Sequence, residues 1–257
     1  MKIGSRIQRI QSCSSTNDFV KELAAGGAPE GMAVIAGEQK QGRGRMERGW
    51  YSPKGKGLYL SVLLRPQQPD ISLLTLAMGL AVSETLRQVF KVRVCLKWPN
   101  DLLWNGKKLG GILCESSFAG DLPAYVVLGI GLNMKQKEGD FPEDLRPTAT
   151  SLSLIMQDAP DQETLLFGLW KRLNKWYDLF VDNKRETIRS AFMKHSCYAP
   201  GQRLAVETGE GIVSGHFKGI SAEGGLVLET RGGEVSYFAA DIRSLQEETE
   251  DGHAFSR

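Results

Sequence analysis

Residues 201–238 read GQRLAVETGEGIVSGHFKGISAEGGLVLETRGGEVSYF, and their texture differs from that of the rest of the chain. Short β-type runs at 203–207, 211–220, 226–230 and 234–238 alternate with Gly-rich turns. Such runs at intervals of about eight to twelve residues are typical of a small barrel or sandwich. Upstream of this segment, strand and helix patterns are mixed. The sequence therefore predicts an α+β domain over residues 1–199 and a small all-β domain over residues 200–257, with a disordered tail.

Helical and strand patterns alternate along the first domain. Apolar spacing predicts one helix that begins at the capping residues 14–17 and ends at the glycines at 26–27, and further helices over residues 71–90, 161–181 and 184–195. Strands are expected at residues 32–36, 58–64, 92–98, 110–115 and 124–132. Asn105-Gly106 is a strong hairpin signal, which we expect to join strand 92–98 to strand 110–115.

The bulk composition excludes several classes of protein. The net charge of +2, from 32 basic and 30 acidic residues, argues against a broad basic face that grips nucleic acid. No apolar run reaches the roughly 20 residues of a membrane span. The four cysteines are Cys13, Cys95, Cys114 and Cys197. They show no CxxC spacing and no nearby histidine, so we expect reduced thiols and no zinc site. These features predict a soluble, cytoplasmic protein.

A local excess of positive charge occurs at residues 42–50, GRGRMERGW. Arginine offers a permanent charge and a planar donor fork, and glycine lets the backbone approach a ligand closely. The run favours a mobile cationic cover over a polyphosphate or an acyl phosphate. Two alternatives stay open from these residues alone: a solvated basic loop, and an RNA-binding segment with Trp50 and Tyr51 as stacking platforms.

Three further segments have polar or glycine residues where strands end. In 97–101, KWPND, Pro99 ends the preceding strand, so the last two residues either face a cleft or cap their own turn. In 107–113, KKLGGIL, a lysine before an apolar strand is either a charge over a pocket or an ordinary surface residue. The glycines of 129–133, GIGLN, indicate close approach of a ligand or of another backbone segment.

The sequence shows no hydrolase triad, paired-carboxylate pattern, metal-ligand pattern or phosphate loop. An enzyme with these residues would act by positioning and by charge stabilisation. Acyl-adenylate formation, in which a carboxylate attacks the α-phosphate of ATP, fits this description.

Taken in order, these segments resemble the biotin protein ligase family across nearly the whole chain. The matching stretches are 15–17 (STN), 38–45 (EQKQGRGR), 97–101 (KWPND), 108–113 (KLGGIL) and 129–134 (GIGLNM). Residues 219–220 and 225–228 are similar to the small SH3-like C-terminal domain of the family. The resemblance implies a mixed sheet with helices, of the class II synthetase-like type, followed by this SH3-like domain.

The resemblance also implies an activity: ATP-dependent formation of biotinyl-5′-AMP, then transfer of biotin to one lysine of a biotin carboxyl carrier protein. The acceptor would belong to acetyl-CoA carboxylase or another biotin-dependent carboxylase. The catalytic residues implied are Lys108, Arg43 and Arg45. The biotin-binding residues implied are Ser15, Thr16, Asn17, Gln39, Arg43, Gly44, Arg45 and Lys108. The ATP- and adenylate-binding residues implied are Arg48, Trp50, Asn100, Asp101, Gly111, Gly129, Gly131 and Asn133. No metal site on the protein is implied, because Mg²⁺ is expected to arrive with ATP.

The chain also departs from the family pattern. The catalytic match begins near residue 12, so we expect neither the winged-helix domain of the family's repressors nor DNA binding. Met46-Glu47 replaces basic and glycine residues that often follow the second arginine of the loop, and residues 135–148 do not align with the family's adenine-covering loop.

A lipoate or octanoate ligase of the same superfamily is the main alternative, although residues 42–45 and 97–101 favour the biotin branch. An exposed strand next to the hairpin would allow a homodimer. The C-terminal domain has two candidate roles, acceptor docking and ATP positioning.

Overall fold

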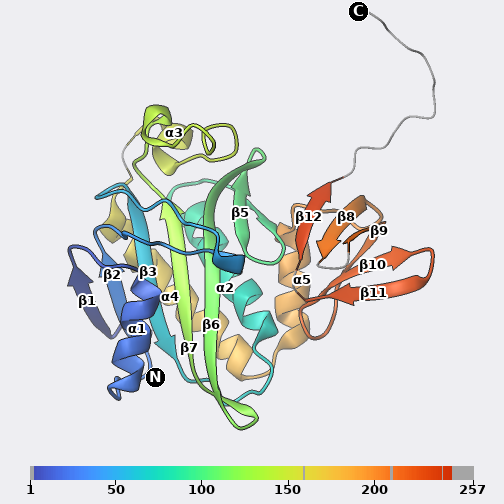
Figure 1. Ribbon diagram of the computed structural model, residues 1–257, viewed down its shortest axis with the longest axis horizontal. Coiled ribbons are helices and arrows are strands. Elements are labelled where there is room, and N and C mark those ends of the chain that lie inside the picture. Colours follow the sequence, from blue (N-terminus) through green and yellow to red (C-terminus); the bar gives the residue numbers. More distant parts are fainter. Residues whose placement is uncertain (1–2, 159, 209–210, 239, 245–257) are drawn as a thin grey trace, which may run out of the picture.

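The computed structural model describes residues 3–158, 160–208, 211–238 and 240–244, which form a large mixed sheet with helices and a small all-β sheet beside it (Figure 1). The strands of the large sheet are β1 (Arg6–Ile10), β2 (Met32–Ala36), β3 (Gly57–Leu64), β4 (Cys95–Lys97), β5 (Asp101–Trp104), β6 (Lys107–Ala119) and β7 (Leu122–Asn133). The helices are α1 (Thr16–Ala25), α2 (Ser72–Val89), α3 (Leu152–Met156), α4 (Gln162–Val181) and α5 (Arg185–His195). Short 3₁₀ turns cover Arg45–Glu47 and Glu138–Asp140.

The seven strands of the large sheet are arranged in the order β1-β2-β3-β7-β6-β5-β4. β1 runs parallel to β2, and the other neighbours are antiparallel. Helix α1 covers one face of the sheet, which we call the α1 face, and α2, α4 and α5 lie on the opposite face (Figure 1). The predicted fold class, α+β with a mixed sheet and a small all-β sheet after it, is confirmed.

Strand β3 is packed on both faces of the sheet, and all eight of its residues are buried. Successive side chains of a strand point to opposite sides. Leu60 and Val62 belong to the main core behind the sheet, whereas Leu63 packs with Val20 and Ala24 of α1. Burial on both faces explains why this strand is a continuous apolar run with no alternation.

The small sheet consists of β8 (Arg203–Thr208), β9 (Gly211–Ile220), β10 (Leu226–Thr230), β11 (Gly233–Tyr237) and β12 (Asp241–Ser244). Its order is β11-β10-β9-β8-β12 and all its pairings are antiparallel. Its buried side chains, such as Phe217 and Leu226, belong to the same contiguous apolar cluster as the core of the large sheet. The domain boundary at residue 200 stays a prediction, and the expected disordered tail lies outside the described residues.

Several expected elements differ from those observed. The Asn105-Gly106 turn joins β5 to β6, not residues 92–98 to residues 110–115 as expected. The chain forms the short β4, turns at a cis Trp98–Pro99 bond and returns as β5, because proline interrupts the strand there. The sequence reading also missed β1, α3 and β12, which have only four or five residues each. Elements this short carry little periodic pattern.

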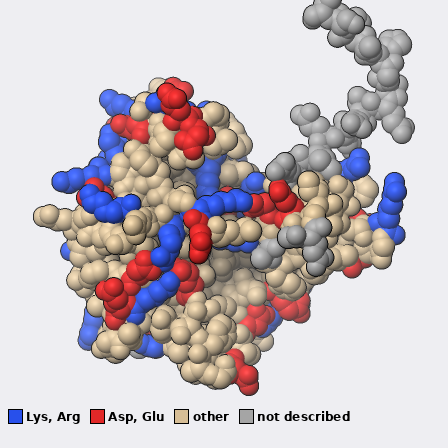
Figure 2. All heavy atoms as spheres, viewed as in Figure 1, with Lys and Arg blue, Asp and Glu red and all other residues tan. Residues whose placement is uncertain are grey.

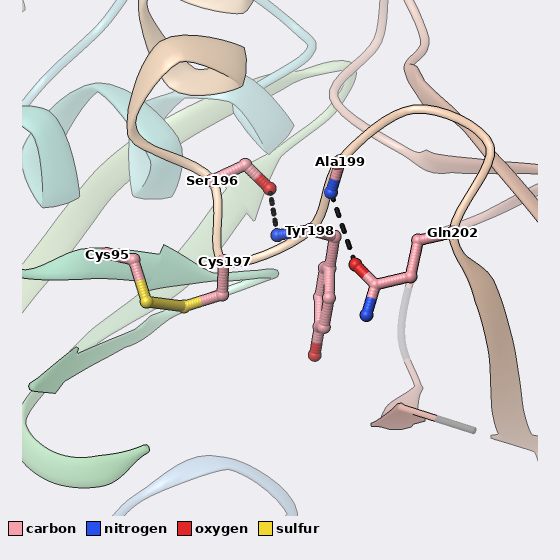
Figure 3. The surroundings of a disulfide bond; sticks show 6 residues. All are labelled: Cys95, Ser196, Cys197, Tyr198, Ala199 and Gln202. Carbon is pink, nitrogen blue, oxygen red and sulfur yellow. Dashed lines mark hydrogen bonds between the residues drawn. A yellow bond between two sulfur atoms is a disulfide. The ribbon is translucent and has the colours of Figure 1, made fainter. Parts of the chain in front are cut away.

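The expectation of four reduced thiols is wrong for two of them. Cys95 and Cys197 form a disulfide, with Cα atoms 4.9 Å apart, across 102 positions of sequence (Figure 3). The amide of Cys197 also donates to the carbonyl of Leu96 at 3.0 Å, which ties the segment after α5 to β4. This pairing joins segments far apart in the chain, so no local cysteine spacing reveals it. Cys13 and Cys114 are free.

The two edges of the large sheet differ. At the β4 edge, Leu96 pairs with Ser196, so the strand expected to be open for dimerisation is partly covered. At the β1 edge, the described residues place no further strand. No described helix combines the length and the apolar character that crossing a membrane would require.

Candidate active site

The candidate site lies on the α1 face, where two glycines of β7 leave a hollow over the sheet. A Cβ atom on Gly129 would lie 2.5 Å from Oδ1 of Asn17, and one on Gly131 would lie 2.6 Å from the ring of Trp50. Both distances are below van der Waals contact, so only glycine fits here. The close neighbours of these glycines are the side chains of Asn17 and Trp50, whereas the sequence indicated a ligand or another backbone segment.

The start of α1 and the segment after β2 form a polar wall of the hollow. The amide and hydroxyl of Thr16 donate to Oε1 of Gln39 at 2.8 and 3.0 Å, and Nε2 of Gln39 donates to Ser52 Oγ at 2.8 Å. The hydroxyl of Ser61 lies 2.7 Å from Thr16 Oγ1 and 2.6 Å from Asn17 Oδ1. These bonds fix the orientation of the amide and hydroxyl groups that line the hollow.

Ser15 is the N-cap residue of α1, yet its side chain makes no capping hydrogen bond. It is buried, and it lines the cavity at the base of the hollow. Its hydroxyl is therefore placed to serve a ligand. The three residues of the STN segment are brought together as the sequence predicts.

The carboxylate of Glu115, on β6, forms hydrogen bonds with side chains of α1. Its carboxylate accepts from Asn17 Nδ2 and from Lys21 Nζ, each at 2.6 Å, and Arg43 lies 3.6 Å away. Burial raises the pKa of Glu115, but the hydrogen bonds from Lys21 and Asn17 and the nearby positive charges outweigh it, so the pKa lies below its ordinary value. Glu115 is therefore an anion that orients Asn17.

Residues 42–50 form a folded loop over the hollow, with a hairpin-like pairing of their own. Trp50 N donates to Gly42 O at 2.8 Å, and Gly44 N donates to Arg48 O at 2.7 Å. At the tip, Met46 and Glu47 have positive φ values of 53° and 57°. Glycine adopts this region without a penalty, whereas these two residues do not. The Met46-Glu47 substitution noted in the sequence thus falls on the conformationally demanding tip.

The three arginines of the loop have different partners. Arg43 Nη1 donates to Asp18 Oδ2 at 2.8 Å, with a second bond from Nη2 to Oδ1, and this hydrogen bonding raises the pKa of Arg43. Arg45 is half-buried and its Nη1 lies 3.5 Å from Oδ1 of Asn100, and burial lowers its pKa. Arg48 pairs with an acidic residue of β12. Figure 2 shows basic and acidic side chains next to one another across this face.

Lys108 brings a further positive charge to the mouth of the hollow. Its ammonium lies 2.7 Å from Oδ1 of Asp101 and 5.5 Å from the centre of the Trp50 ring. Lys108 stands at the start of β6, where its amide donates to Thr148 O at 2.7 Å. The buried indole N–H of Trp50 has no hydrogen-bond partner among the described residues. It packs over Gly131, where a Cβ atom would lie 2.7 Å from Nε1.

A cavity of about 40 Å³ remains at this place. Its lining consists of Ser15, Thr16, Asn17, Gln39, Arg43, Gly44, Trp50, Asn100, Lys108, Gly111, Ile112, Leu113, Gly129, Ile130 and Gly131. This is far below the roughly 300–1,000 Å³ of typical small-molecule sites. The loop over residues 42–50 supplies Arg43, Gly44 and Trp50 to the lining and so lies close over the site, and we expect it to open to admit a larger ligand.

Four predicted site residues do not line this cavity. Arg45 lines an adjoining cavity of about 160 Å³ between β6, α2 and the small sheet. Asp101 contacts the site through Lys108, and Arg48 points to β12. Asn133 is buried, donates to Thr150 O at 2.9 Å and accepts from Gln136. In this conformation Asn133 holds the segment after β7, and its role toward the adenylate stays a prediction.

The sequence reading missed four polar residues that hold the predicted ones in place: Asp18, Ser52, Ser61 and Glu115. Ser61 had a signal, since it is the one polar residue in an otherwise apolar run of seven at 58–64. A buried polar side chain requires a partner, which here is the start of α1. The other three have no comparable pattern in the sequence.

Two parts of the chain match known protein families, and the chain as a whole is similar to named enzymes. Residues 9–133 match the biotin/lipoate A/B protein ligase family, and residues 201–243 match the biotin protein ligase C-terminal domain. The bifunctional ligase/repressor BirA of Bacillus subtilis is 36% identical over 231 residues, which are 89% of this chain and 71% of BirA. The biotin–[acetyl-CoA-carboxylase] ligase of Mycobacterium tuberculosis is 34% identical over 248 residues, covering 92% and 87% of the two chains.

A solved structure shows the same arrangement. The biotin protein ligase from Aquifex aeolicus, in complex with biotin and ATP, superposes with a TM-score of 0.82 and 29% sequence identity. The match covers 94% of this chain and 100% of that one, so it includes both sheets.

Proposed function

The chain belongs to the biotin/lipoate A/B protein ligase family as a biotin protein ligase, and from this premise we propose how its own residues carry out the reaction. The enzyme activates biotin with ATP to biotinyl-5′-AMP and then transfers the biotinyl group to a lysine of a carrier protein. The observation that supports this most is the polar, glycine-floored hollow beneath a cationic loop, with Lys108 at its mouth.

The polar wall binds the head of biotin. A ureido ring carries two N–H donors and one carbonyl acceptor, so it requires both kinds of partner. Ser15 and Thr16 supply hydroxyl groups, and Asn17 and Gln39 supply side-chain amides whose orientation is already fixed. Gly129 leaves the space above the sheet for the Asn17 side chain, so that this amide can face the ureido ring.

The cationic residues act on the carboxyl end of biotin. One carboxylate oxygen attacks the α-phosphorus of ATP, a P–O bond to biotin forms, and pyrophosphate leaves with the electrons of the broken P–O bond. Negative charge builds up on the phosphoryl oxygens at this stage, and fixed positive charges stabilise it. Lys108 lies where both groups meet, and Arg43, Gly44 and Arg45 cover them from the loop.

ATP lies toward β5, β6 and the mouth of the hollow. Trp50 offers its unpaired N–H, and Asn100, Asp101, Gly111, Gly131, Asn133 and Arg48 are the remaining candidates for contacts to the nucleotide. No group of three or more His, Cys, Asp or Glu among the described residues would enclose a metal ion. Magnesium is commonly held by one or two carboxylates together with substrate phosphates, and Asp101 fits that role. The ion would neutralise phosphate charge when it arrives with ATP.

In the second step, the neutral ε-amine of an acceptor lysine attacks the carbonyl carbon of biotinyl-AMP. The amide bond forms, the C–O bond to AMP breaks, and the amine loses a proton. The closed loop over residues 42–50 excludes water from the mixed anhydride until the acceptor arrives. We propose the biotin carboxyl carrier domain of acetyl-CoA carboxylase as the acceptor, in line with the substrate that the name of the Mycobacterium tuberculosis relative states.

A labelling assay tests this function. The protein is incubated with ATP, Mg²⁺, biotin and the carrier domain from the same source, and the products are probed with streptavidin. We expect label on the carrier that requires both biotin and ATP, and no modification when lipoate or octanoate replaces biotin. Absence of label on the carrier would exclude the proposed activity, and transfer of lipoate or octanoate would support the other branch of the family.

Three further expectations stay predictions. They are the homodimer, the absence of DNA binding and the cytoplasmic location. The Cys95–Cys197 disulfide counts against a strongly reducing compartment, because disulfides persist mainly in oxidising environments.

A further inference from the structure

The loop over residues 42–50 is held on its far side by the small sheet. Arg48 Nη1 donates to Asp241 Oδ1 at 3.3 Å, and a second bond joins Nη2 to Oδ2. The two residues are 193 positions apart in the sequence, and Asp241 is the first residue of β12. The near side is held by Arg43, which is paired with Asp18 of α1. The loop therefore lies between two ion pairs, one on each side of the hollow.

The position of Asp241 is set by the fold of the small sheet. β12 pairs with β8, where Asp241 lies opposite Glu207. The small sheet is itself attached next to the site, because Trp98 Nε1 donates to the carbonyl of Gly224 at 2.9 Å. Both partners of this bond are buried, so it holds the turn between β9 and β10 against the large sheet, while Asp241 reaches the loop from β12.

Asp241 also acts on the second arginine of the loop. Burial lowers the pKa of Arg45, while the charges of Asp241 and Asp101 oppose that effect and Arg48 adds to it. Asp241 is thus close enough to favour the charged form of Arg45 and to neutralise the repulsion between the two arginines. Its carboxylate serves the loop in two ways, as a hydrogen-bond acceptor and as a counter-ion.

We propose that Asp241 is a positioning residue that latches the loop closed through Arg48, so that the small sheet controls how long the acyl-adenylate is retained. The inference rests on the proposed function for its adenylate, but the latch itself exists without substrate. It differs from the assignment of Arg48 to the nucleotide, since here Arg48 acts through a carboxylate of the protein.

The strength of this pair suits a latch that must reopen. The side chains of Arg48 and Asp241 are 65% and 35% exposed. Exposed ion pairs are weak and screened by salt, so we expect loss of the pair to change opening by about two- to fivefold. A stronger bond would slow entry of ATP and of the acceptor lysine.

The test compares Asp241→Asn with Glu234→Gln, which removes an exposed acid of β11, at the opposite edge of the small sheet from β12. The first readout is the rate at which trypsin cuts after Arg45 in the ligand-free enzyme. The second is the rate at which preformed biotinyl-AMP leaves the enzyme. We expect Asp241→Asn to raise both rates about two- to fivefold at low salt, with a smaller effect at 1 M salt, and Glu234→Gln to match the wild type.

A charge reversal separates the latch from other roles of these residues. In the double variant Arg48→Asp with Asp241→Arg, the ion pair is restored in the opposite sense, and we expect the trypsin cleavage rate of the ligand-free enzyme to return toward the wild-type value. Wild-type rates in Asp241→Asn, or no rescue by the reversal, would overturn the latch. If the wild type forms no biotinyl-AMP, the proposed function fails, and the trypsin cleavage still decides the latch.

Discussion

In the proposed mechanism, Lys108 is the residue on which the chemistry of the site depends most. Its ammonium is paired with Asp101 at 2.7 Å and lies over the Trp50 ring, so its position is fixed before any substrate binds. A charge fixed in advance costs little reorganisation when negative charge develops on a phosphate. A phosphate that binds here would compete with the Asp101 carboxylate for the Lys108 ammonium.

Replacing Lys108 by alanine is predicted to lower the rate of biotinyl-AMP formation by about 100-fold or more, as expected for loss of one electrostatic stabiliser. The measurement is pyrophosphate release in the presence of biotin and ATP. Lys107→Ala, which removes the exposed neighbouring charge, is the matched control and should leave the rate unchanged. Unchanged pyrophosphate release in Lys108→Ala would remove Lys108 from the mechanism.

Gly129→Ala is predicted to raise the KM for biotin by about tenfold or more. The new methyl would lie 2.5 Å from Asn17 Oδ1, and Asn17 cannot retreat because Ser61 and Glu115 hold it. Overpacking of this kind typically costs about 1–3 kcal/mol. Gly139→Ala is the control, since a Cβ there meets open space. Equal KM values for the two variants would show that the position of Asn17 over Gly129 does not determine biotin binding.

Among the elements of the fold, the loop over residues 42–50 has two proposed roles, which are to cover the reacting groups and to keep water from the adenylate. It carries Arg45 toward Asn100 and contributes Trp50 to the wall of the hollow. Its own hydrogen bonds give it a defined shape, and its ends follow β2 and precede β3 in the sheet.

Arg45→Ala is therefore predicted to release biotinyl-AMP about tenfold faster or more. The variant would lose the proposed hydrogen bond from Arg45 to the adenylate, and a hydrogen bond to a charged group is worth about 1.5–3 kcal/mol. The free adenylate then reacts with lysines of other proteins, so biotin label on an added bystander protein reports the release. Met46→Ala, at the exposed tip of the same loop, is the control. Bystander labelling that does not rise above this control would argue against the loop as a cover.

The elements of the fold differ in how well their sequence patterns predict them. Strong periodic or apolar patterns predicted α1, β2, β9 and β10 almost to the residue. Strands β4 and β5 were misassigned, because Pro99 divides a polar and apolar mixture into two pieces of three and four residues. In such short pieces, pairing with neighbouring strands decides the structure more than the local pattern does.

For the whole molecule, the relation between the two sheets is the feature that sequence patterns reveal least. The disulfide, the Trp98–Gly224 bond and the Arg48–Asp241 pair all join residues more than 100 positions apart. The ordered short motifs predicted most of the residues that line the hollow. They gave no sign of Asp241, Ser52 or Asp18, since these contacts depend on how distant segments meet in the fold.

The disulfide is predicted to stabilise the whole fold, because it closes a long loop that would otherwise be free in the unfolded chain. Loss of such a bond typically costs about 2–4 kcal/mol. Cys197→Ser should therefore lower the free energy of unfolding by this amount in oxidising buffer, measured by urea denaturation. Cys13→Ser, which leaves the disulfide intact, is the control.

Reducing agent provides the complementary comparison for the disulfide. Dithiothreitol should lower the stability of the wild type to that of Cys197→Ser and leave the stability of the variant unchanged. Equal stability of wild type and Cys197→Ser in oxidising buffer would contradict a stabilising role for this bond.

We propose that this chain makes biotinyl-5′-AMP in the hollow between α1, the loop over residues 42–50 and β7. The exchange of labelled pyrophosphate into ATP tests this without other steps, since it needs only the first reaction and no acceptor protein. We expect exchange with biotin that falls about 100-fold or more in Lys108→Ala, and none with lipoate or octanoate. Absence of exchange with biotin, or equal exchange with lipoate, would contradict it.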